Sequence, residues 1–356
     1  MRIRSLTIAG LLAFSALAPA PVAAQTAISA PSGQPWKHDQ TGVTLPASIA
    51  GIARTSLADN SRSQIDVMAG YGDGTANVVT LYVFRPALAS VPMWFDRSET
   101  QILMRDVYGN ATPAAAAAAF APPRGKATSA LRRIYVPGKA PYKSTGLAIM
   151  PLGDWLVAVR ISSAELDAAA LDAKLDEVIK SIGWPDGTAD ALPATPVEPC
   201  AAPLAYAKKA KLKAPDMGDA ILGAALGSII ADKEKDAKDG KTDPDMKVTP
   251  VTWCREGSPG LAFATYRANG LDTGYTMAIG DAGVVIDVSS GLGALLGKEP
   301  GYQVRVQLLD RTLIYPSFDK LPTPDAALAA VKGNSPVSAV DRGSSNVVIS
   351  SDAIKK

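Results

Sequence analysis

The chain has 356 residues, of which 47% are hydrophobic and 20% are charged, an ordinary composition for globular domains. Its 36 Lys and Arg residues against 34 Asp and Glu residues give a net charge of 36 − 34 = +2, and Arg2 and Arg4 supply both positive charges. The rest of the chain is therefore near neutral, and it has no basic run beside aromatic residues. Both features disfavour nucleic acid and anionic membranes as partners. The length predicts two domains.

Residues 1–24 have the pattern of a secretory signal peptide. Arg2 and Arg4 form a positive start, residues 6–18 are apolar, and Val22-Ala23-Ala24 is a small-residue cleavage site. The apolar run has thirteen residues, short of the roughly 20 needed to span a bilayer. We therefore expect an exported protein, periplasmic or secreted, whose mature chain starts at Gln25 and has no integral membrane span.

Residues 25–35 are polar and contain Pro and Gly, which predicts a flexible leader. The first domain is expected over residues 36–187. It opens with short strands, followed by strands at 64–71 and 77–85 joined by the glycine-rich turn 70–74. Helical patterns at 92–108 and 114–119 precede a strand at 130–136.

The most consistent segment is residues 144–185. Two apolar β-type runs, 146–152 and 155–161, are joined by the turn signal Gly153-Asp154. Ser162 and Glu165 then have the spacing of a helix capping box. An apolar face at helical spacing predicts a helix that ends at Gly183 and Pro185; its members are Leu166, Leu171, Leu175, Val178, Ile179 and Ile182.

Short turns between strands imply an antiparallel sheet, and single-faced helices must pack on it. Residues 42–184 resemble the Mog1/PsbP-type α/β/α domain. The resemblance rests on the element order, the Gly42-Val43-x-Leu45-Pro46 strand and the helix end at 179–182. It implies an α/β/α sandwich and a binding or accessory role, and it transfers no functional residue.

Residues 188–203 are proline-rich and predict a semi-rigid linker. The second α+β domain is expected over residues 204–333, with helices at 204–213 and 217–231 and a solvated charged run at 232–247. Strands follow at 247–254, 261–267, 274–279, 284–288 and 303–316, and a helix at 324–331. Residues 334–356 predict a polar tail with one strand-like patch at 347–349.

Cys200 and Cys254 are the two cysteines of the chain. In an exported protein an even pair predicts a disulfide, here within the second domain. A catalytic dithiol is disfavoured because the two residues are far apart in sequence and form no Cys-x-x-Cys motif.

Few residues offer chemistry. His38, the single histidine, is expected at the surface or at a strand edge, and one histidine excludes a multi-histidine metal site. Ser317 and Lys320 match a Ser-x-x-Lys spacing, but they lie between prolines rather than on a helix. The acidic run from Asp232 to Asp245 lacks the glycine and glutamate of a calcium loop and is interleaved with lysines.

The sequence thus predicts no catalytic, cofactor-binding or metal-binding residue. The leading hypothesis is a non-catalytic exported binding or accessory module for an envelope protein or a small apolar ligand. An exported hydrolase whose site is not local in sequence, and a structural envelope component, are the alternatives. An aromatic-lined pocket would support ligand binding, and a buried cluster of Asp and Glu, or of Ser with Lys, at a cleft would support the enzyme. A flat apolar patch with neither would support a partner surface.

Overall fold

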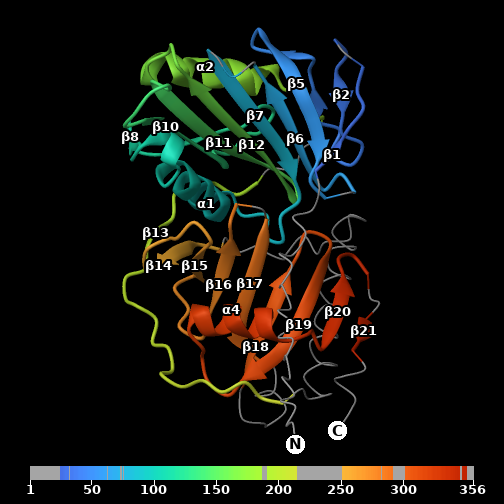
Figure 1. The fold of residues 1–356 in the computed structure, drawn as a ribbon, viewed down its shortest axis with the longest axis vertical. Coiled ribbons are helices and arrows are strands. Elements are labelled where there is room, and N and C mark those ends of the chain that lie inside the picture. Colours follow the sequence, from blue (N-terminus) through green and yellow to red (C-terminus); the bar gives the residue numbers. More distant parts are fainter. Residues whose placement is uncertain are drawn as a thin grey trace, which may run out of the picture.

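The computed structural model describes residues 25–31, 33–61, 63–72, 74, 76–186, 191–214, 251–281, 283–291, 301–344 and 347–350. The signal peptide expected over 1–24, the helix expected over 217–231 and the charged run at 232–247 lie outside these residues. The described chain is α+β and rich in sheet, with two large sheets and three α-helices (Figure 1).

The first sheet has the strand order β1-β5-β6-β7-β12-β11-β10-β8, with every described pairing antiparallel. β4 adds to β5, β9 adds to β10, and β2 and β3 form a separate pair. The bounds are β1 Thr26–Ala27, β2 Trp36–Lys37, β3 Thr44–Leu45, β4 Ser48–Ile49, β5 Ile52–Asp59, β6 Asp66–Tyr71, β7 Asn77–Phe84, β8 Thr112–Pro113, β9 Ala118–Phe120, β10 Ala130–Val136, β11 Ser144–Leu152 and β12 Trp155–Ser163.

The hairpin of β11 and β12 lies at the centre of this sheet, as its sequence predicts. Leu152 pairs with Trp155, so Gly153 and Asp154 form a two-residue turn, and Gly153 has the positive φ of 62° that such turns require. Both strands are buried almost throughout. Nearly continuous apolar sequences are expected where both faces of a sheet are covered.

Helix α2 (Ala168–Ser181) packs on one face of the first sheet and is capped by Asp167, whose side chain accepts a hydrogen bond from the Ala170 N–H. The capping box expected at Ser162 is therefore wrong. Ser162 belongs to β12, where its hydroxyl lies 2.9 Å from Thr145 Oγ1. The strand continues past 161 because this hydroxyl has a partner inside the fold.

Helix α1 (Val91–Leu103) packs on the opposite face, against β10 and β11. Ser90 caps its first turn by accepting a hydrogen bond from the Met93 N–H. The helix ends earlier than predicted, and a 3₁₀ turn, η1 (Asp106–Tyr108), follows. The alanine run at 114–119 is not helical; its end forms β9, an edge strand paired with β10. Tertiary pairing here overrides the helix propensity of alanine.

The second sheet has the order β13 to β21 in sequence, antiparallel except for the parallel pair β13–β14. Helix α4 (Pro324–Gly333) packs against β18 and β19. The strand bounds are β13 Glu198–Pro199, β14 Trp253–Glu256, β15 Phe263–Ala268, β16 Gly274–Ile279, β17 Val284–Ser290, β18 Tyr302–Gln307, β19 Arg311–Phe318, β20 Ser338–Asp341 and β21 Val347–Ile349.

Two sequence predictions in this half need correction. The single strand expected over 303–316 is a hairpin, β18 and β19, that turns at residues 308–310. The basic segment 204–213 is not helical; Leu204 and Tyr206 pack against the core of the second sheet, and Leu212 bridges to Phe318. Burial of this segment against the sheet decides its extended course.

The predicted leader and tail both contribute strands. Thr26 and Ala27, within the leader expected over 25–35, pair with Asp59 and Ala58 of β5. Within the tail expected over 334–356, β20 pairs with β19, and β21 pairs with β20. Short segments of modest β-propensity become strands here because an open sheet edge offers them partners.

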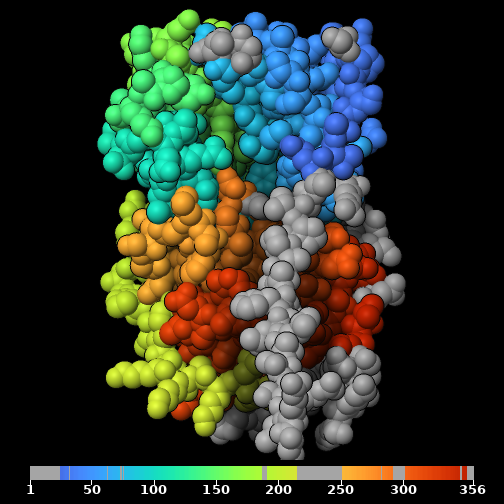
Figure 2. Space-filling model, in the orientation of Figure 1, coloured from blue at the N-terminus to red at the C-terminus, as the bar shows by residue number. Residues whose placement is uncertain are grey.

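The two sheets share a hydrophobic cluster at their junction. It joins α1 residues such as Trp94 and Phe95 and first-sheet residues such as Leu147 to Tyr266 and Val285 of the second sheet. Residues 191–197, part of the segment expected to act as a spacer, also belong here, because Ala194 is buried and its N–H donates to Thr128 O. Figure 2 shows the two parts meeting across the middle of the molecule.

Within the described residues, no helix combines the length and apolarity needed to cross a membrane.

Candidate functional site

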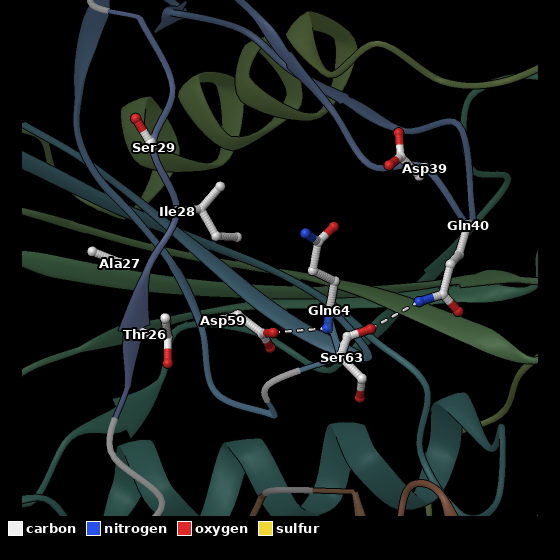
Figure 3. Close-up of a pocket in the computed structure, with 9 residues that line it drawn as sticks. All are labelled: Thr26, Ala27, Ile28, Ser29, Asp39, Gln40, Asp59, Ser63 and Gln64. Atoms are coloured by element: carbon white, nitrogen blue, oxygen red, sulfur yellow. Dashed lines mark hydrogen bonds between the residues drawn. The ribbon is translucent and has the colours of Figure 1, made fainter.

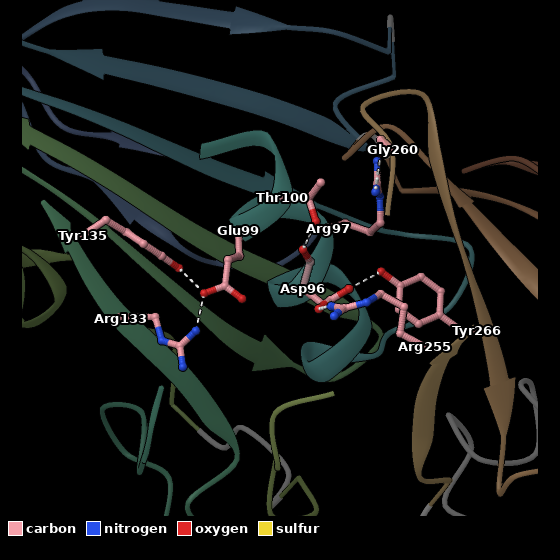
Figure 4. A network of polar contacts seen from close by, with 9 residues as sticks. All are labelled: Asp96, Arg97, Glu99, Thr100, Arg133, Tyr135, Arg255, Gly260 and Tyr266. Atoms are coloured by element: carbon pink, nitrogen blue, oxygen red, sulfur yellow. Dashed lines mark hydrogen bonds and ion pairs between the residues drawn. The ribbon is translucent and has the colours of Figure 1, made fainter. Parts of the chain in front are cut away.

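Helix α1 carries a set of buried charged residues that face both sheets (Figure 4). Asp96 is 4% exposed and pairs with Arg255 of β14, while its second oxygen accepts a hydrogen bond of 2.6 Å from the Tyr266 hydroxyl. Burial raises the pKa of Asp96, and the hydrogen bond from Tyr266 opposes this rise. Both oxygens of this carboxylate are therefore bonded within the protein.

Arg97, the next residue, is fully buried and reaches the second sheet. Its three guanidinium nitrogens donate to the carbonyl oxygens of Gly280, Gly260 and Leu261 at 2.7, 2.9 and 3.1 Å. Burial lowers the pKa of Arg97, which nearby Tyr266 and Asp96 counteract. The fork of donors matches three backbone acceptors on two turns, so Arg97 fastens α1 to the second sheet.

One turn further along α1, Glu99 faces back to the first sheet. It accepts hydrogen bonds from Arg133 at 2.5 Å and from the Tyr135 hydroxyl at 3.1 Å. Burial and the nearby Glu99 raise the pKa of Tyr135 well above its usual value. Asp96, Arg97 and Glu99 thus hold the two sheets to one helix, and their side chains are committed to structural contacts.

Beside the first turn of α1 lies a cavity of about 310 Å³, which we call the junction pocket. Its walls come from α1, β11, the proline-rich segment and the start of β14. The lining is mainly apolar and includes Val91, Pro92, Pro151, Leu192, Val251 and Trp253.

Two of these side chains are unusually exposed for their type. Leu192 is 47% exposed and Val251 is 51% exposed. Ser90 and Ser129 add hydroxyl groups to the lining. A concave apolar site with an aromatic wall and few polar groups is typical of small-molecule pockets, and this volume is at the lower end of their range.

A second cavity, of about 640 Å³, lies at the β1 edge of the first sheet, and we call it the edge pocket (Figure 3). It is bounded by residues 26–29, by the turn at Asp39 and Gln40, and by the β5–β6 turn with Asp59, Ser63 and Gln64. Its polar lining contrasts with that of the junction pocket.

His38 is fully buried directly after β2, so the surface position, one of the two that were expected, is wrong. Its Nε2 is 2.7 Å from Gln64 O, and a carbonyl oxygen only accepts, so Nε2 carries the proton. Its Nδ1 accepts from the Thr41 N–H at 3.3 Å and lies 2.8 Å from Thr41 Oγ1. The imidazole ring also packs against the ring of Trp155, with the two ring centroids 5.0 Å apart. His38 therefore ties the β2–β3 turn to the β5–β6 turn.

The Ser-x-x-Lys pair is not brought together as a helix would bring it. Ser317 lies buried on β19, and Lys320 follows the strand in an exposed position. Another lysine, Lys213, lies near this serine. A Cβ placed on Gly301 would lie 3.1 Å from Lys213 Nζ and 3.4 Å from Ser317 Oγ. The two polar atoms flank one small space although about a hundred residues separate them in sequence, so no local motif could have indicated the pair.

The disulfide predicted between Cys200 and Cys254 is confirmed. It spans 54 residues, with the two Cα atoms 4.8 Å apart, and joins the residue after β13 to β14. Arg267 Nε lies 3.3 Å from Cys200 Sγ. The crosslink anchors the proline-rich segment to the second sheet close to the junction pocket.

Among the described residues, no group of three or more His, Cys, Asp or Glu side chains is placed to hold a metal ion. The carboxylates of α2 lie on its exposed side, where Asp176 pairs with Lys180 and Arg132, and Glu177 pairs with Lys174. These contacts are ordinary surface ion pairs.

Comparison with known proteins gives no match: no family model, curated protein or solved structure corresponds to this chain. The two pockets and the hydrogen-bonded charges of α1 are therefore the features of the molecule that bear on its function.

Sequence reasoning missed both pockets. Each is assembled from segments far apart in the chain: the junction pocket joins residues near 90, 151, 192 and 253, and the edge pocket joins residues near 27, 40 and 64. No local pattern marks either pocket, because the exposure of Leu192 and Val251 is evident only from the structure.

Proposed function

We propose that the protein is a non-catalytic, exported binding module that holds a small apolar ligand in the junction pocket. The observation that carries the proposal is the mainly apolar lining, to which Trp253 and the first residues of α1 contribute. Burying apolar ligand surface against such walls provides about 25 cal/mol for each Å² removed from water. Export is supported by the signal-peptide pattern of residues 1–24 and by the disulfide.

The buried charges favour binding over catalysis. Asp96, Arg97 and Glu99, which follow the pocket-lining residues Val91 and Pro92 on α1, are bonded to groups of the protein itself. A general acid or base needs a free site that reaches the substrate. These three side chains hold the two sheets around the pocket, which suits a preformed ligand site.

The two-domain division, with a first domain over 36–187 and a second over 204–333, is part of the same proposal. Two sheets with separate cores on their outer faces support it. The helices α1 and α2 on opposite faces of the first sheet support the α/β/α arrangement that the Mog1/PsbP-type resemblance implies. The shared cluster at the junction leads us to propose that the two parts act as one body around the ligand.

The test uses indole and octan-1-ol as probes of the purified mature protein. Binding should raise the melting temperature and shift the amide resonances of Val91, Leu192 and Trp253. Ala89→Trp places a large side chain on the pocket lining and should abolish both effects. Ala201→Trp, at an exposed position outside the lining, is the matched control and should preserve them.

Shifts that spare these residues, or that persist in Ala89→Trp, would refute the junction pocket as the site. Covalent labelling by a fluorophosphonate probe that disappears in Ser317→Ala would instead favour the exported hydrolase, since Lys213 lies near that serine. Flat apolar contact with a partner protein, without binding of either probe, would favour an accessory or structural component of the envelope.

A further inference from the structure

The edge pocket has a lining whose chemistry differs from that of the junction pocket. Two carboxylates, Asp39 and Asp59, line it, and no Lys, Arg or His is among the described residues that do so. The remaining polar lining consists of hydroxyl and amide side chains. A cavity with one sign of charge attracts ligands of the opposite sign.

Gln64 is held in an unusual backbone conformation at the floor of this pocket. Its φ of 57° is in the left-handed region, which costs a residue with a side chain roughly 1–2 kcal/mol. Two contacts hold it there: its N–H donates to Asp59 Oδ2 at 2.7 Å, and its carbonyl accepts from buried His38 at 2.7 Å. Glycine would adopt this conformation without that cost, so a glutamine at this position makes the folded protein less stable than a glycine would.

The glutamine side chain points into the cavity. Figure 3 shows it extending into the space between residues 28–29 and the turn with Asp39 and Gln40. Among the described residues its amide has no hydrogen-bond partner, and neither has the carboxylate of Asp39 or the hydroxyl of Ser29. A free amide offers both a donor and an acceptor, and a free carboxylate offers acceptors with a charge.

The other carboxylate has a structural role. Asp59 is 4% exposed and accepts from the Ser61 and Gln64 N–H groups and from the Ser61 hydroxyl at 2.6–2.8 Å. It contributes negative charge beneath the cavity while Asp39 remains available for direct contact. Gln40 is likewise committed, because its amide donates to Ser63 O at 3.0 Å. The recognition groups are thus Asp39 and Gln64, since Figure 3 shows the Ser29 hydroxyl directed away from Gln64.

We propose that the edge pocket binds a small hydroxylated amine in its protonated form, of the amino-sugar class. The ammonium group pairs with Asp39, and the ligand hydroxyls exchange hydrogen bonds with the Gln64 amide. The cavity of about 640 Å³ is large enough for one such ring with bound water. This site is separate from the junction pocket and does not depend on the proposed apolar ligand.

The test is titration calorimetry of the whole mature protein with glucosamine at slightly acidic pH, where the amine is protonated. Glucose and N-acetylglucosamine are the neutral comparisons, and each should bind at least about tenfold more weakly, because a hydrogen bond to a charged group is lost. Added salt should weaken glucosamine binding. Equal affinity for the neutral sugars, or no binding of glucosamine, would overturn the proposal.

Two variants separate binding from folding. Gln64→Gly relieves the left-handed conformation, so it should leave the melting temperature unchanged or higher while weakening glucosamine binding by roughly tenfold. Asp39→Asn keeps the side-chain shape and should remove the preference for glucosamine over glucose. Asp272→Asn, an equal charge change at an exposed position in the β15–β16 turn, is the control. Unchanged affinity in both Gln64→Gly and Asp39→Asn would place the ligand elsewhere.

Discussion

Replacing Arg97 by methionine tests whether one side chain fastens the two sheets together. Arg97→Met keeps the length and apolar stem of the residue but removes three hydrogen bonds, to the carbonyls of Gly280, Gly260 and Leu261. A buried acceptor that loses its partner costs about 1–3 kcal/mol. The Leu261 carbonyl keeps its hydrogen bond from Gln101, so this cost falls on the carbonyls of Gly260 and Gly280. Removing a buried charge and adding apolar contact offset part of this sum. We expect a net loss of about 3 kcal/mol.

The measurement is equilibrium unfolding in urea, followed by tryptophan fluorescence and by far-ultraviolet circular dichroism. The shared cluster at the junction predicts that the wild-type protein unfolds in one transition in both signals. In Arg97→Met the two sheets lose three of the hydrogen bonds that join them, so the two signals should separate. Separation would show that the second sheet and the first then unfold independently.

Arg124→Met is the matched control. Arg124 pairs with Asp186 at the surface, where the two side chains are 48% and 98% exposed. Surface ion pairs contribute roughly 0–1 kcal/mol, so this variant should unfold almost as the wild type does. If Arg97→Met costs no more than Arg124→Met, the view of Arg97 as the connection between the sheets is wrong.

Two further predictions concern stability. Burial and nearby Asp59 and Asp281 raise the pKa of Asp66 to about 6. The folded state therefore binds a proton on the Asp66 carboxyl more tightly than the unfolded state does. The resulting stability, up to about 3 kcal/mol, is present below pH 3.8 and lost as pH rises through about 6. In Asp66→Asn, the free energy of unfolding measured in urea should change less with pH between these two values. A pH dependence equal to that of the wild type would refute the raised pKa of Asp66. Cys200→Ser should lower the free energy of unfolding by about 4 kcal/mol, and a midpoint equal to that of the wild type would contradict a stabilising crosslink.

The β11–β12 hairpin, the apolar face of α2 and the disulfide were all predictable. Each depends on residues close in sequence or, for the disulfide, on there being a single possible pair. The cap of α2 was misplaced because the Ser162 hydroxyl is chemically able to cap a helix. In the fold it instead contacts the Thr145 hydroxyl, and only the tertiary structure shows this. The strand at Ala118–Phe120 escaped prediction because a neighbouring strand, rather than local propensity, decides it.

By itself, the sequence determined the α+β character, the main strands of both sheets and the pairing of Cys200 with Cys254. Local patterns carry this information because period, turn residues and caps act over a few positions. The tertiary structure decided everything that joins distant segments: the burial of His38, the role of Arg97 and both pockets. Such features depend on side chains that meet only after the sheets have formed, and no local pattern records which distant residues will meet.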